Sequence, residues 1–231
     1  MKQNRVKYIL AATLLLPLFL YLQYAFAKET PEKIAYITFD DGPTLNTPDI
    51  LKTLEEYDAK ATFFVLEERI IQYPDFIKQI YYSKNALGLH GVSHSEAIYN
   101  TPTSPLEEME KTNKALHNLL GEDTKLVRVP YGSGYRLTKK QAEILEENEY
   151  SLWDWNVDPR DSVGKIIPER IMSNLCRDLK KCKGNPVILL HDRKSTARLL
   201  PDLLEVLRSE GYTMYPLDED LPPLNFVKKE N

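Results

Sequence analysis

The sequence predicts an α/β fold, a distorted (β/α) barrel with about seven parallel strands in a single domain. Short apolar runs alternate with amphipathic segments, which is typical of parallel strands joined by crossover helices. Seven strand candidates suit either a barrel or an open doubly wound sheet. Polar clusters directly follow several of these strands, and barrel enzymes carry their chemistry at the C-terminal ends of the strands. This placement favours the barrel.

Each expected element has a local signal. The strand candidates are the apolar runs at 33–39, 61–66, 87–89, 126–129, 151–157, 186–190 and 212–217. The helix candidates cover 74–82, 104–120, 138–148, 168–181 and 196–209, and one more begins at 47. Thr47 can cap that helix, and capping boxes at 104–107 and 138–141 open two others. Gly121 ends one helix, while Pro201 interrupts the last helix or delays its start.

The first residues indicate export. Three cations, Lys2, Arg5 and Lys7, precede a nearly unbroken apolar run that ends in Ala25-Phe26-Ala27. A basic start, an apolar centre and small residues at the cleavage position are typical of a signal peptide. The run is also close to the ~20 residues that a membrane-spanning helix needs. We therefore expect residues 1–27 to be a signal peptide or an uncleaved membrane anchor, and residues 28–231 to form one exported domain, secreted or attached to the cell surface or wall.

The charge balance argues against several partners. The chain has 30 Lys and Arg against 34 Asp and Glu, a formal net charge of −4, and three of its cations lie in the leader. An acidic domain with scattered charge does not predict nucleic-acid binding. The membrane is therefore expected as a partner only through an uncleaved N-terminal segment, and the domain is expected to be a monomer.

The two cysteines, Cys176 and Cys182, are six residues apart within an expected helix, on different faces. Export permits a disulfide, which would require the helix to end between them. Two free, half-buried thiols are the alternative.

Two short motifs together predict a metal site. Asp40 and Asp41 end an apolar strand, and adjacent carboxylates can divide their roles, one binding a cation and the other acting as a base. His90 and His94 lie four residues apart, so both imidazoles face the same side if the segment forms a helical turn. A carboxylate with two imidazoles suits zinc, and three protein ligands leave a coordination position for water, as in catalytic sites.

Three more polar motifs follow later strands: residues 128–132 (Arg-Val-Pro-Tyr-Gly), residues 158–161 (Asp-Pro-Arg-Asp) and residues 189–191 (Leu-Leu-His). In this order, the five motifs closely resemble those of the polysaccharide deacetylases, the NodB-homology group of carbohydrate esterase family four. The resemblance runs from about Ile34 to Tyr215. It implies a distorted (β/α) barrel with fewer units than the eight-fold form. It also implies a hydrolase that acts on the linear amide bond of an N-acetyl group.

The resemblance assigns the metal and the base. By its match, Asp41 with His90 and His94 would hold a divalent metal, usually zinc, with cobalt or nickel as alternatives. Asp40 would be the general base that takes a proton from water, and Arg128 would pair with Asp40 to fix its charge and orientation.

The resemblance also assigns the groups that act on the substrate. Tyr131 would contribute its backbone N–H to the oxyanion of the tetrahedral intermediate, and Leu189 would line the pocket for the acetyl methyl group. His191 would be the general acid for the leaving sugar amine. Asp161 would pair with His191 and raise its pKa.

Two positions depart from the family pattern: Gly91 stands where Ser or Thr is usual, and Ser162 stands where Trp is frequent. The resemblance implies a glycan polymer as substrate, and we expect the N-acetylglucosamine of peptidoglycan. Chitin oligomers, an exopolysaccharide or muramic acid are alternatives, as is a catalytically weak glycan-binding relative. The presence of Asp40, Arg128 and His191 argues against the last.

Overall fold

The computed structural model describes residues 33–164 and 166–227 of the 231-residue chain. The expected leader, residues 1–27, lies outside these described residues. Within them, no helix combines the length and the apolar character needed to cross a membrane.

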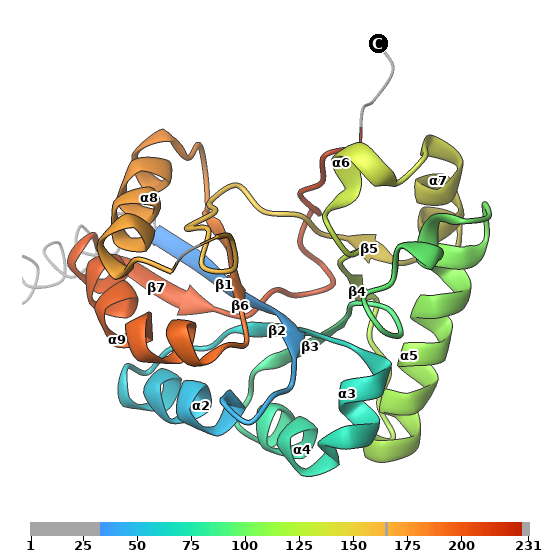
Figure 1. Cartoon of the computed structure of the whole chain (residues 1–231), viewed down its shortest axis with the longest axis horizontal. Helices are drawn as coiled ribbons and strands as arrows, with labels where there is room; N and C mark the ends of the chain where they lie inside the picture. Colours follow the sequence, from blue (N-terminus) through green and yellow to red (C-terminus); the bar gives the residue numbers. More distant parts are fainter. Residues whose placement is uncertain (1–32, 165, 228–231) are drawn as a thin grey trace, which may run out of the picture. The chain divides into compact units, whose positions relative to one another are not determined.

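Seven parallel strands form one sheet with the order β5-β4-β3-β2-β1-β6, and β7 also pairs with β1. The strands are β1 (Lys33–Gly42), β2 (Thr62–Val65), β3 (Ala86–Leu89), β4 (Leu126–Val127), β5 (Ser151–Leu152), β6 (Val187–His191) and β7 (Tyr212–Tyr215). A bridge between Val157 and Ile188 connects the segment after β5 to β6, at the other end of the strand order. The sheet therefore curls round as a distorted barrel, which confirms the predicted fold class (Figure 1).

The helices lie around the outside of the curled sheet (Figure 1). They are α2 (Thr47–Glu56), α3 (Glu67–Gln72), α4 (Pro74–Tyr82), η1 (Glu96–Tyr99), α5 (Ser104–Leu120), α6 (Ser133–Arg136), α7 (Lys139–Glu147), α8 (Pro168–Lys181) and α9 (Lys194–Ser209). The short elements α3, η1 and α6 were not expected from the sequence. Cys176 lies in α8 and Cys182 directly follows it, and both thiols are free.

Some helix-end predictions hold and others fail. The capping box at Thr138 is present, with both of its hydrogen bonds. Gly121 ends α5 in the left-handed conformation that favours glycine. The capping box at Ser104 is wrong, because Ser104 lies inside α5 and its N–H donates to Thr101 Oγ1 at 3.1 Å. Thr103 precedes the helix without a side-chain cap.

Pro201 does not interrupt α9, which runs through it. Leu200 and Leu203, on either side of the proline, are buried in the core, and this packing outweighs the ~3 kcal/mol that an internal proline typically costs. The expected strand at 151–157 is also shorter than predicted. The N–H of Trp153 still donates to the carbonyl oxygen of Val127 in β4. The N–H of Asp154 instead donates to the carbonyl oxygen of Leu224 in the C-terminal segment.

The two faces of the sheet bury different side chains. Along β1, Ile37 and Phe39 belong to a large apolar cluster that includes residues of the surrounding helices. Tyr36 belongs to a smaller cluster made of strand and loop residues on the inner face. Side chains alternate along a strand, so Thr38 and Asp40 also face the barrel interior. The inner face thus changes from apolar to polar toward the C-terminal end of β1.

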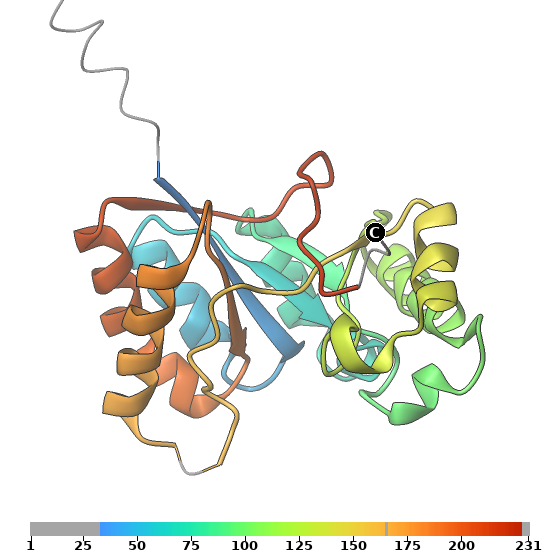
Figure 2. The ribbon, with the colours of Figure 1, turned by 90° about the horizontal axis from the view of Figure 1, so that it is seen from above.

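The chain after β7 runs across the N-terminal ends of the strands toward α6 and α7 (Figure 2). The N–H of Leu217 donates to Thr62 Oγ1 at the start of β2, at 2.8 Å. Further on, the N–H of Phe226 donates to the carboxylate of Asp154 at 2.7 Å. Asp154 is fully buried and also accepts hydrogen bonds from the backbone and hydroxyl of Ser133. The C-terminal segment therefore supports the loop that follows β4.

Candidate active site

Asp40 and Asp41 reach the same region although they are neighbours in a strand. The pairing of β1 with β2 shifts register between Asp40 and Gly42, and Asp41 has a φ of 69°. This irregularity turns the carboxylate of Asp41 toward the same side of the strand as the carboxylate of Asp40. His90 Nε2 consequently lies 3.9 Å from Asp40 Oδ2 and 3.5 Å from Asp41 Oδ1.

Asp41, His90 and His94 form a compact group of ligand atoms, all within 4.8 Å of one another. Asp41 Oδ1 lies 3.5 Å from His90 Nε2 and 3.6 Å from His94 Nε2. A tetrahedral zinc ion with bonds of about 2.1 Å separates its ligand atoms by roughly 3.4 Å. Asp41 Oδ1 is buried and accepts no hydrogen bond from the part of the chain that the structure describes. Both the spacing and this orphaned oxygen fit a divalent cation.

The protonation of these groups suits metal binding. Burial alone would raise the pKa of Asp41, but the neighbouring imidazoles of His90, His191 and His94 hold it well below its usual range. Burial lowers the pKa of His94. A carboxylate and a neutral imidazole are the ligand forms that zinc binds. Arg193 adds a positive charge 4.0 Å from Asp41 Oδ2.

The segment between His90 and His94 does not form the helical turn that their four-residue spacing would allow. The segment after β3 is irregular, and His94 has a φ of 57°. Bends at residues 92–94 nonetheless bring the centroids of the two rings to within 5.2 Å of each other. His90 Nδ1 lies 2.7 Å from the carbonyl oxygen of Arg128, which can only accept. The proton is therefore on Nδ1, and the lone pair of Nε2 faces Asp41.

Arg128 is fully buried in the barrel interior beside Asp40, which is 3% exposed. Its Nη1 donates to Asp40 Oδ1 at 2.8 Å. The other acceptors of the guanidinium are the hydroxyl of Thr38 and the carbonyl groups of Trp153 and Asp154. The guanidinium also lies over the ring of Phe64, 4.2 Å from its centroid. This fixed ion pair holds one oxygen of Asp40 and leaves the other facing the histidines.

His191 ends β6 and pairs in register with Asp40 on β1. Its Nδ1 lies 2.8 Å from Asp161 Oδ1, and its backbone N–H donates to Asp161 Oδ2 at 2.8 Å. Thr196 Oγ1 donates to the same carboxylate at 2.6 Å. Burial alone would lower the pKa of His191, but the hydrogen bond and charge of Asp161 outweigh it and raise that pKa above its usual value. His191 and Asp40, the expected acid and base, thus stand on adjacent strands.

Tyr131 and Leu189 flank this group. Tyr131 has a φ of 65°, and its half-exposed ring packs edge-on against His94 with centroids 4.6 Å apart. Its backbone N–H donates to none of the described residues, so that donor is free for a ligand. Leu189 is buried on β6, opposite Thr38 in the register. Ser162, where the family often has Trp, is half-buried.

Asp192 is a site residue to which sequence reasoning gave no role. It is buried, its N–H donates to Asp40 O at 3.1 Å, and its carboxylate accepts from Thr44 and Thr47. Burial raises the pKa of Asp192, although the hydrogen bonds from these threonines act to lower it. Thr47, expected as a helix cap, is instead the first residue of α2. A Cβ on Gly42 would lie 2.9 Å from Asp192 Oδ2, so a side chain there would displace this hydrogen-bonded carboxylate. In the sequence, Thr44 and Thr47 follow Asp40 and Asp41, and these two hydroxyl groups were the available signal that a buried acceptor lies nearby.

Comparison with known proteins places the chain in a family. The polysaccharide deacetylase family model matches residues 27–151. YheN of Bacillus subtilis, classed as a polysaccharide deacetylase, is 36% identical over 200 residues, which cover 84% of this chain and 70% of that protein. A peptidoglycan-N-acetylglucosamine deacetylase of Bacillus cereus is 31% identical over 205 residues, 84% of this chain and 73% of its own.

The fold agrees with this similarity. The crystal structure of the polysaccharide deacetylase Bc1974 from Bacillus cereus superposes with a TM-score of 0.76 at 31% identity, over 84% of this chain and 97% of that one. The sequence match, the superposed fold and the curled parallel sheet all agree. The chain therefore belongs to the polysaccharide deacetylase family of hydrolases, which act on amide bonds.

Proposed function

We propose that the protein is a metal-dependent deacetylase that removes N-acetyl groups from N-acetylglucosamine residues of peptidoglycan, outside the cytoplasm. One observation carries the proposal: the cluster of Asp41, His90 and His94 lies beside the buried base Asp40 and the acid His191. The name of the Bacillus cereus relative supports the choice of polymer. The leader suggested by the sequence supports the location, and we propose that the domain acts as a monomer.

Asp41, His90 and His94 would hold the metal, and zinc is the ion that best suits one carboxylate and two imidazoles. Cobalt and nickel are the alternatives. When bound, the ion supplies Lewis acidity at the acetyl carbonyl. His90 donates its second ring N–H to the carbonyl of Arg128, which fixes the orientation of the ring.

The remaining residues supply proton transfer and positioning. Asp40 takes the proton of the attacking water, while its ion pair with Arg128 keeps it oriented. The Tyr131 N–H donates to the developing oxyanion, and Leu189 contacts the acetyl methyl group. His191, held by Asp161, gives a proton to the leaving sugar amine, so the amide C–N bond breaks with a neutral amine as product.

The function can be tested by measuring acetate release from muropeptides, together with the zinc content of the purified protein. We expect stoichiometric zinc, and release that a chelator abolishes and added zinc restores. Parallel assays on chitin oligomers and on an exopolysaccharide test the polymer, and sugar analysis of the digested muropeptides separates glucosamine from muramic acid as the product. Glycan binding by the zinc-loaded protein with no acetate released from any polymer would instead indicate a binding protein.

Asp161→Asn is expected to shift the pH dependence of turnover. His191 must be protonated to act as the acid, so turnover falls as the pH rises through its pKa. Asp161 raises that pKa, and its charge is lost in the variant, so the alkaline limb of the kcat profile should move to lower pH. Thr196→Val is the control, because it removes a hydrogen bond to Asp161 and keeps the charge. An unmoved limb in Asp161→Asn would contradict the assigned acid.

A further inference from the structure

The loop from His90 to His94 carries two of the proposed ligands but has no regular secondary structure. Its carbonyl groups at Gly91 and Val92 accept hydrogen bonds from the first two backbone N–H groups of α3, at 3.0 and 3.2 Å. The first N–H groups of a helix have no partner inside the helix. The start of α3 therefore fixes the carbonyl side of this loop.

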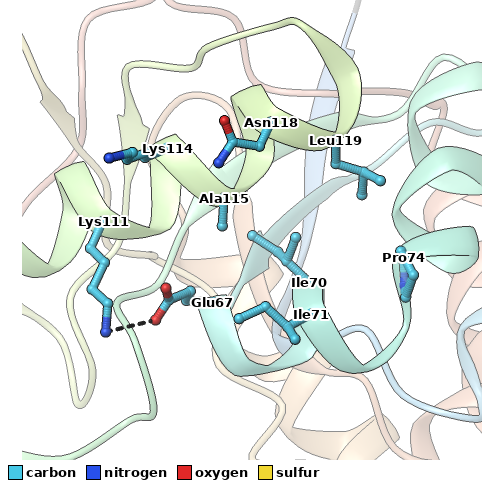
Figure 3. Close-up of a pocket in the computed structure, with 9 residues that line it drawn as sticks. All are labelled: Glu67, Ile70, Ile71, Pro74, Lys111, Lys114, Ala115, Asn118 and Leu119. Carbon is cyan, nitrogen blue, oxygen red and sulfur yellow. Dashed lines mark ion pairs between the residues drawn. The ribbon is translucent and has the colours of Figure 1, made fainter.

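Glu108 of α5 holds the loop from the other side. The N–H of Val92 donates to Glu108 Oε2 at 3.0 Å, and a charged acceptor makes this bond stronger than a neutral one. The helices α3 and α5 are joined by an ion pair of 3.2 Å between Lys111 and Glu67, on the wall of a groove of about 540 Å³ (Figure 3). No proposed ligand lines that groove. Its walls come mainly from α3 and α5, the two helices that hold the loop, with Pro74 of α4 at one side.

The backbone of the loop leaves space for the carboxylate of Glu108 at Gly91. Gly91 has a φ of 90°, and a Cβ on it would lie 2.9 Å from Glu108 Oε2. A side chain at position 91 would therefore displace the carboxylate from Val92. His94 has a left-handed φ of 57°, which a non-glycine residue keeps only where its surroundings enforce it.

We propose that Glu108 is a positioning residue for the metal site, and that it acts through the Val92 N–H to hold His90 and His94 in their binding geometry. Glu108 itself is not among the ligand atoms. The inference rests on the proposed function, because it assumes that the two histidines bind a metal.

The test is the zinc affinity of the purified chain, measured by competition with a chelating dye. Glu108→Ala should weaken zinc binding about 10- to 100-fold, the usual effect of losing a group that orients metal ligands. Glu108→Gln should bind zinc like the unmodified protein, because its amide oxygen still accepts from Val92. Glu110→Ala is the matched control, an exposed glutamate on the same helix, and should change nothing. His94→Ala shows the effect of losing a ligand.

The outcomes separate the two proposals. Unchanged zinc affinity in Glu108→Ala overturns the role of Glu108 and leaves the proposed function standing. Absence of zinc binding in the unmodified protein, or unchanged binding in His94→Ala, overturns the metal site and this inference with it. If Glu108→Ala does not fold, Glu108→Asp keeps the charge on a shorter side chain, and should weaken zinc binding because its carboxylate no longer reaches the Val92 N–H. Unchanged affinity in that variant also overturns the inference.

Discussion

Asp40→Asn is expected to slow acetate release by about 10²- to 10⁴-fold, the usual contribution of a general base, and to leave zinc binding stoichiometric. An amide cannot accept the proton of the attacking water. Its oxygen can still accept from Arg128, so the buried side chain keeps a partner and the protein should remain folded. The measurements are acetate release from muropeptides at saturating zinc and elemental analysis of the purified variant.

Asp41→Asn is the matched comparison, because the two acids are neighbours in sequence and meet the same imidazole. This variant should lose zinc as well as turnover, since Asp41 Oδ1 is the orphaned oxygen between the two histidines. Loss of zinc in Asp40→Asn, or full turnover in that variant, would show that the roles of the two acids have been assigned the wrong way round.

Local patterns in the sequence were enough to predict the barrel and to bring the main site residues together. Parallel strands place their C-terminal ends at one edge, so Asp40 and His191 meet as register partners once the strands are recognised. The capping box at Thr138 was also predictable from local sequence, because all of its atoms lie within one helical turn.

Interactions between distant segments were not predictable in this way. Asp192 accepts hydrogen bonds from Thr44, 148 residues earlier in the chain, and the threonines that follow Asp41 do not by themselves indicate which distant acid they contact. The four-residue spacing of His90 and His94 fits a helical turn, but the segment between them is an irregular loop. Its actual shape depends on Glu108, 16 residues away on α5. Tertiary hydrogen bonds therefore decide the backbone of the metal site.

Arg128→Met is expected to destabilise the protein by about 3–5 kcal/mol, the usual cost of removing one partner of a buried ion pair. Arg128 is fully buried, and the loss of its guanidinium leaves the Asp40 carboxylate in the barrel interior without its cation. Urea denaturation followed by circular dichroism gives the free energy of unfolding. Turnover should fall as well, because the base loses the group that orients it.

The double variant Asp40→Asn/Arg128→Met distinguishes the stranded charge from lost packing over Phe64. Removing the carboxylate removes the buried charge, so the double variant should be more stable than Arg128→Met by about 1–3 kcal/mol, a coupling expected for groups in contact. Equal stability of the two variants would assign the loss to packing alone. Recovery of stability in the double variant would assign the loss to the stranded carboxylate, while its turnover should stay low because the proposed base is absent. The Arg128 cation is then what makes a buried carboxylate tolerable beside His90.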